Sequence, residues 1–171
     1  YEAFLKAMIA AGFKLPAKNI LISIGPASQK VEFAQYAQTL AEMGYQLYAT
    51  KQTAQFLKAH ARVESLIVVN KPFIKREPNA LTMLKAGKLD LVINVPDSMD
   101  SQALSDGFEL RRAAVDSGTS LLVDVKTAIL VIQSLHRKYT RERSGKEFFS
   151  LQSWQEYCEP RESVQRGPLR D

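Results

Sequence analysis

The chain has 171 residues, of which 46% are hydrophobic and 24% are charged. These are values of an ordinary folded domain, and they exclude a disordered or low-complexity protein. A chain of this length can bury a core without covalent cross-links, and its single cysteine, Cys158, excludes an internal disulfide. One cysteine fits a reducing compartment, so we expect a cytoplasmic location.

The formal net charge of +5 comes from 23 basic and 18 acidic residues. A nucleic-acid binder usually carries a basic stripe with interleaved aromatic residues. Residues 136–143 come nearest to such a stripe, but they include an acid, Glu142. No apolar run reaches the roughly 18 residues of a membrane span. We therefore expect neither a nucleic-acid partner nor a membrane span. Because the chain begins with Tyr1 and not with Met, we also expect a piece of a longer polypeptide.

The predicted elements alternate along the chain. Residues 2–11 carry apolar side chains at helical spacing, and Gly12 is a natural stop. Residues 19–24, NILISI, form a short β-branched run that Gly25 and Pro26 end. The same criteria predict strands over residues 19–24, 46–49, 66–69, 89–94 and 120–123, and helices over residues 2–11, 30–43, 54–59, 80–86, 108–116 and 127–136.

Short, continuous apolar strands that alternate with helices are typical of a parallel sheet covered on both faces. With right-handed crossovers, this order predicts a single doubly wound α/β domain with a five-stranded parallel sheet flanked by helices. We place this domain over residues 16–137. Residues 138–171 are charged and lack a clear period, which predicts a partly ordered tail. The alternative is that its apolar residues dock as a short amphipathic turn or helix, namely Phe148, Phe149, Leu151 and Trp154.

The residues that follow the predicted strands indicate where a ligand binds, because open parallel sheets bind ligands beyond the carboxyl ends of their strands. Polar and basic side chains gather there. Helix N-termini, hydroxyl groups and ammonium groups together make a site for an anion, either phosphate or carboxylate. Each residue also fits a structural role, as a helix cap, a turn residue or a solvated lysine. The candidate site residues are Lys30, Thr50, Thr53, Lys71 and Asn94.

Motifs for catalysis are missing from the sequence. There is no Cys/His spacing typical of a metal site, no phosphate-binding glycine motif and no nucleophile elbow. His60 and His136 fall toward the ends of predicted helices, away from the candidate site. We therefore predict no catalytic residue, no metal ligand and no cofactor for this chain.

Four sequence blocks carry a resemblance to a known family. They are NILISI at 19–24, GYQLYAT at 44–50, LDLVIN at 89–94 and LRRAAVDSG at 110–118. Together they resemble the methylglyoxal-synthase-like domain family, in particular the C-terminal allosteric domain of the carbamoyl phosphate synthetase large subunit. The opening YEAFLKAM resembles the segment that leaves the second ATP-grasp half of that enzyme, so residues 1–15 are expected to be a linker helix from a catalytic region.

The resemblance implies an effector site. In microbial members of the family, UMP is held by residues that correspond to the five candidate residues named above. The lysine that opens the first helix corresponds to Lys30, the two threonines after the second strand to Thr50 and Thr53, and the remaining lysine and asparagine to Lys71 and Asn94. We expect Thr53→Val to weaken effector binding without changing the melting temperature of the free domain.

Two alternatives remain within the same family. The stretch NVPD at residues 94–97 resembles the N-acetylglutamate-activated animal form, although that form has a tryptophan at the position of Lys71 and asparagines at those of Asp97 and Gly107. A lysine suits a phosphate dianion, so UMP is preferred. The lyase methylglyoxal synthase needs a Gly-Gly-Asp segment and a histidine near the phosphate. Here the segment reads KRE at residues 75–77, and no histidine lies between residues 94 and 118.

The resemblance therefore implies a regulatory domain that is not catalytic alone. The parent would be an ATP-dependent ligase that makes carbamoyl phosphate for pyrimidine or arginine synthesis. Its ATP, with Mg or Mn, would bind outside this chain. The implied partners are a small allosteric effector, the rest of the large chain and a glutaminase subunit, and self-association is left open.

Overall fold

The central element is a sheet of five parallel strands in the order β3-β2-β1-β4-β5. The computed structural model describes residues 1–97 and 101–149, with the side chains of residues 101–106 excepted. In register, Ile22 of the first strand pairs with Ala49 on one side and with Ile93 on the other. The strands are β1 (Asn19–Ile24), β2 (Gln46–Thr50), β3 (Ile67–Val69), β4 (Leu91–Val95) and β5 (Ser120–Leu122).

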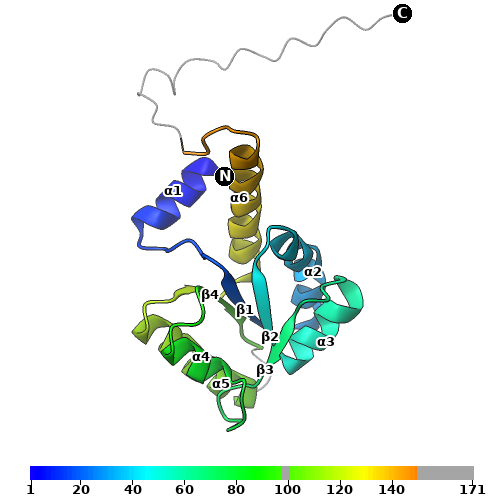
Figure 1. The fold of residues 1–171 in the computed structure, drawn as a ribbon. Coiled ribbons are helices and arrows are strands. Elements are labelled where there is room, and N and C mark those ends of the chain that lie inside the picture. The colour runs from blue at the N-terminus through cyan, green and yellow to red at the C-terminus, as the bar shows by residue number, and fades with distance from the viewer. Residues whose placement is uncertain (98–100, 150–171) are drawn as a thin grey trace, which may run out of the picture.

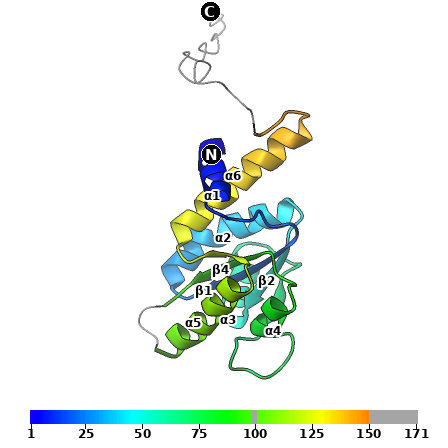
Figure 2. The same cartoon turned by 90° about the vertical axis from the view of Figure 1, so that its left-hand side faces the viewer.

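Helices cover both faces of this sheet, as Figures 1 and 2 show. The described helices are α1 (Glu2–Ala10), α2 (Ala27–Glu42), α3 (Lys51–His60), α4 (Ala80–Lys85), α5 (Ser101–Asp116) and α6 (Val125–Arg143). Helices α2, α3 and α6 share a core with one face, which includes Phe33, Leu57 and Ile132. Helices α4 and α5 bury Leu84 and Leu110 against the other face. The predicted doubly wound α/β fold is confirmed.

The N-terminal helix α1 packs on the C-terminal helix α6, and the two lie side by side in Figure 1. Leu5 is fully buried in the core that α2, α3 and α6 form with one face of the sheet, which is the larger of the two cores. The guanidinium of Arg137 lies 4.4 Å from the ring centroid of Tyr1, a cation–π contact. The segment predicted as a linker is therefore docked against the domain, and its role as a connection to a catalytic region stays a prediction.

Two helices extend furthest beyond their predicted bounds. Helix α5 begins at Ser101 and not at residue 108, and helix α6 continues to Arg143 and not to residue 136. The last seven residues of α6, 137–143, lack apolar residues at helical spacing, so the sequence pattern could not predict that the helix continues. It is held by neighbours one turn apart, such as Lys138 and Glu142 at 2.6 Å. His136 consequently lies inside α6 and not near its end.

The stretch predicted as a tail begins inside α6, since this helix crosses residue 138. Beyond the helix, Phe148 is buried in the larger core and meets Phe149 edge to face, with ring centroids 5.0 Å apart. Leu151, Trp154 and Cys158 lie outside the described residues. The division of the chain into domains stays a prediction. Among the described helices, none combines the length and apolar character needed to cross a membrane.

Asp124 caps the N-terminus of α6, the longest described helix, and we predict that stability depends on it. Its carboxylate accepts hydrogen bonds from the Thr127 backbone N–H at 2.8 Å and from the Thr127 hydroxyl at 3.0 Å. These bonds, the backbone one first, lower the pKa of Asp124 below its ordinary value. Asp124→Ala should lower the free energy of unfolding by about 1 kcal/mol near neutral pH, as measured by urea denaturation.

The pH dependence follows from the sign of this shift. A carboxylate whose pKa is lower in the folded state stabilises the fold above its unfolded pKa, and this contribution is lost as the pH falls through the folded value. Asp124→Asn keeps the accepting oxygen and should match the native chain near neutral pH, but should lose less stability below about pH 4. Equal acid sensitivity of the two proteins would contradict the assignment.

Candidate functional site

A cavity of about 100 Å³ opens at the carboxyl edge of the sheet. The chain winds outward from β1 through β2 to β3 and then crosses to β4 on the opposite side of β1. Strands β1 and β4 therefore form the switch point, where a doubly wound sheet leaves a crevice for a ligand. The cavity is lined from this crevice by residues 23–25 and 94–97, and from the ends of β2 and β3 by Thr50 and Lys71.

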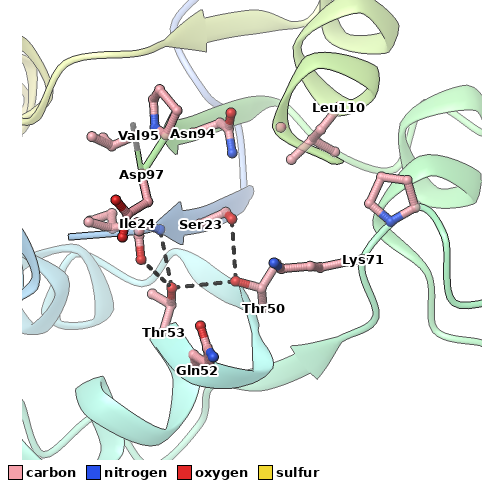
Figure 3. Close-up of a pocket in the computed structure, with 14 residues that line it drawn as sticks. Ser23, Ile24, Thr50, Gln52, Thr53, Lys71, Asn94, Val95, Asp97 and Leu110 are labelled. Atoms are coloured by element: carbon pink, nitrogen blue, oxygen red, sulfur yellow. Dashed lines mark hydrogen bonds between the residues drawn. The ribbon is translucent and has the colours of Figure 1, made fainter. Parts of the chain in front are cut away.

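Three hydroxyl groups meet at one side of the cavity (Figure 3). The Thr50 hydroxyl lies 3.3 Å from Oγ of Ser23 and 3.4 Å from Oγ1 of Thr53. Thr50 is the N-cap residue of α3, but its side chain makes no capping hydrogen bond. Its hydroxyl instead lies between the hydroxyl groups of Ser23 and Thr53 in the cavity wall.

The hydroxyl of Thr53 has a structural task. It accepts a hydrogen bond from the Ile24 backbone N–H at 3.1 Å and donates one to the Ile24 carbonyl at 3.2 Å. Thr53 is 1% exposed, so water cannot replace these bonds. The Thr53 hydroxyl therefore ties the start of α3 to the end of β1.

This geometry changes the expectation for Thr53→Val. Valine keeps the shape but leaves the buried Ile24 N–H without its acceptor, which costs about 1–3 kcal/mol. We now expect a lower melting temperature of the free domain as well as weaker effector binding. A thermal melt measures the first effect, and Thr39→Val is the control, since Thr39 is half-buried on α2 and its hydroxyl donates to the Gln35 carbonyl in a solvent-exposed bond. An unchanged melting temperature would restore the expectation drawn from the sequence.

Asn94 is the next-to-last residue of β4, and it lines the cavity and is 4% exposed. Its Oδ1 accepts a hydrogen bond from Nη1 of Arg111, on α5, at 2.7 Å. Its Nδ2 lies on the cavity side in Figure 3, so the amide presents donor hydrogens to the cavity. Gly107 gives Arg111 its room, because a Cβ atom there would lie 2.6 Å from the same Nη1.

Two charged side chains also line the cavity. Lys71 follows β3 and extends toward Thr50 in Figure 3. Asp97 follows β4 and lies so close to Gly25 that a Cβ atom on that glycine would lie 2.7 Å from the Asp97 backbone nitrogen. One basic and one acidic residue thus line the same cavity, together with Asn94 and Thr50.

The structure brings four of the five predicted site residues to the cavity wall, and Lys30 is the exception. Lys30 lies in the first turn of α2, where its backbone N–H binds the Pro26 carbonyl at 3.1 Å. The role of each residue in binding stays a prediction.

The sequence prediction missed Ser23 and Arg111. Ser23 lies inside a strand and not after it, and Arg111 acts from a helix 17 positions beyond Asn94, so neither belongs to the residues that follow a strand. The alternation of side chains along β1 could have indicated Ser23, but no pattern in the sequence indicates Arg111. Within residues 1–97 and 101–149, no group of three or more histidine, cysteine or acidic side chains could hold a metal ion.

Comparison with known proteins identifies the family. The family model described as "MGS-like domain" matches residues 32–122, more than half of the chain. The chain belongs to the MGS-like domain family. The matched region contains every strand of the sheet except β1, and it includes Thr50, Lys71 and Asn94. The resemblance predicted from the four sequence blocks is confirmed.

The curated relatives are much longer proteins. The chain is 40% identical over 154 residues to Multifunctional protein URA2 of Saccharomyces cerevisiae, and the match covers 86% of the chain but 7% of that protein. It is 37% identical over 150 residues to the mitochondrial carbamoyl-phosphate synthase [ammonia] of Aquarana catesbeiana, with 87% of the chain and 10% of that protein covered. The chain thus spans about a tenth of the length of such relatives or less.

Among solved structures, methylglyoxal synthase from Elizabethkingia anophelis NUHP1 has the same fold. The two structures superpose with a TM-score of 0.52 at 20% sequence identity, and the match covers 69% of this chain and 79% of the synthase. At this identity the likeness concerns the fold.

Proposed function

We propose that this chain is the allosteric, effector-binding domain of a carbamoyl phosphate synthetase. The observation that carries the proposal is the cavity at the β1–β4 switch point, where Lys71, the Thr50 hydroxyl and the Asn94 amide converge. The relatives supply the context, because a carbamoyl-phosphate synthase is one of the proteins that contain a similar segment. A domain that binds an effector would bias the parent between states through differential affinity.

The effector we propose is phosphorylated, with UMP as the first choice. A lysine ammonium is a compact charge that meets a phosphate dianion well, and two donor groups stand beside it. Uracil and ribose offer acceptor oxygens for the Asn94 amide and the Ser23 hydroxyl. Thr53 then supports the site by fixing the strand end beneath it.

N-acetylglutamate is the second candidate effector, and one observation favours it. Asp97 lines the cavity, and a carboxylate there opposes a phosphate that comes close. A ligand with an acetyl group and two separated carboxylates could keep its charges on the Lys71 side. Lys71 is a poor wall for an acyl chain, however, so we place this effector second.

A lyase activity is disfavoured by the side chains in the cavity wall. Proton transfer in a triose phosphate needs a general base and an acid within hydrogen-bond reach. The described residues that line the cavity include one carboxylate, Asp97, and no histidine. Glu77, the acid of the segment KRE, instead binds the Asn79 backbone N–H at 2.8 Å and lies outside the cavity wall.

The parent protein completes the proposal. We assign no cofactor to this domain, and place ATP with Mg or Mn in the catalytic part of the same longer chain. The rest of that chain and a glutaminase subunit are the proposed macromolecular partners. The cytoplasm is the proposed location; the relatives named carbamoyl-phosphate synthase [ammonia] include mitochondrial proteins.

Calorimetric titration of the purified chain tests the proposal. UMP, uridine, N-acetylglutamate and inorganic phosphate should be titrated at matched ionic strength. We expect UMP to bind, uridine to bind more weakly, and UMP binding to weaken with salt. Binding of N-acetylglutamate alone would move the assignment to the second effector. No heat with any ligand, together with turnover of a triose phosphate, would overturn the regulatory function.

A further inference from the structure

We propose that Arg111 is a positioning residue of the effector site, which fixes the Asn94 amide so that its NH₂ group faces the cavity and receives an acceptor oxygen of the effector. The inference rests on the proposed function. It adds to the site a residue of α5, which could not be found by considering only the residues that follow the strands.

Hydrogen-bond chemistry decides the orientation of the Asn94 amide. A guanidinium carries donors and no acceptor, so only the carbonyl oxygen of the amide can face it. Nη1 of Arg111 lies 2.7 Å from Oδ1 of Asn94, which places Nδ2 on the opposite, cavity side (Figure 3). Without Arg111, a flip of the amide would present an acceptor to the ligand. Arg111 therefore determines that the Asn94 side chain presents a hydrogen-bond donor, and not an acceptor, to the cavity.

The surroundings maintain this contact. Asn94 is 4% exposed, so its amide has little access to water as a substitute partner. Gly107 lies one helical turn before Arg111 on α5, and a Cβ atom there would lie 2.6 Å from Nη1 and 3.3 Å from Oδ1 of Asn94. The absent side chain thus makes room for the guanidinium beside the amide.

The adjacent arginine on the same helix provides a matched control. Arg112 is exposed and binds Asp116 through its Nε, 2.9 Å from Oδ2. It does not line the cavity. Arg111→Met and Arg112→Met therefore remove the same charge and the same number of donors, one beside the site and one on the surface.

The first measurement needs no ligand. The side-chain amide signals of Asn94 in a ¹H–¹⁵N spectrum can be assigned by their disappearance in Asn94→Asp. We expect Arg111→Met to shift these signals and Arg112→Met to leave them unchanged, with Arg111→Lys restoring most of the native position. Unchanged Asn94 signals in Arg111→Met would overturn the inference even where UMP binds normally.

The second measurement is calorimetric titration with UMP. Arg111→Met should weaken binding about tenfold, the equivalent of one directed hydrogen bond, whereas Arg112→Met should bind as the native chain does. Asn94→Asp should keep the melting temperature, since its carboxylate pairs with Arg111, but lose UMP because an acceptor now faces the cavity. Native affinity in Arg111→Met would overturn the inference. Failure of the unaltered chain to bind UMP would instead overturn the proposed effector.

Discussion

Lys71→Ala should abolish most of the affinity for UMP. Removing an ammonium group that meets a phosphate costs about 1.5–3 kcal/mol, which corresponds to a loss of roughly 10-fold to 150-fold in binding. Lys71 lies at the end of β3 with its side chain directed along the cavity toward Thr50 (Figure 3). Calorimetric titration at low salt measures the loss, and uridine, which lacks the phosphate, should be affected much less.

Lys75→Ala is the control for this experiment. Lys75 belongs to the same loop and is exposed, but it does not line the cavity. Its removal changes the net charge of the chain by the same amount as removal of Lys71. A similar loss of UMP in both variants would mean that the general positive field of the loop attracts the ligand, and that Lys71 makes no specific contact.

The residues of the cavity wall could be predicted from the sequence as far as backbone topology determines them. Thr50, Lys71 and Asn94 lie at or near the carboxyl ends of strands, and parallel strands bring these ends to one edge whatever their side chains are. Lys30 has the same kind of position in the sequence but lies in the first turn of α2, away from the cavity wall. The direction of a side chain on a helix depends on how the helix packs, and periodicity does not supply that.

Contacts between elements could not be predicted from the sequence for the same reason. The bond between Arg111 and Asn94 joins a helix to a strand, and the bonds of Thr53 join a helix to the end of β1. Local propensity contains no term for such partners. The extension of α6 to Arg143 was missed because its last turns are stabilised by neighbouring charges and not by an apolar stripe.

The larger core should depend most strongly on Phe33, the largest fully buried side chain among the described residues. It lies on α2 in the same apolar cluster as Ile22 of β1 and Ile132 of α6, so it joins one helical layer to the sheet. Phe33→Ala removes this contact and leaves a cavity between three elements. We expect a loss of about 3–5 kcal/mol in the free energy of unfolding.

The effect of UMP on the melting temperature provides a second measurement on Phe33→Ala. A loss of that size is comparable to much of the stability of a domain, so Phe33→Ala should populate unfolded chain at physiological temperature. Saturating UMP should then raise its melting temperature, because a ligand that binds the folded state pulls the equilibrium back. Phe73→Ala is the control, since Phe73 is 56% exposed and its removal leaves no cavity. Urea denaturation compares the two, and equal losses would show that α2 is not held to the sheet through Phe33.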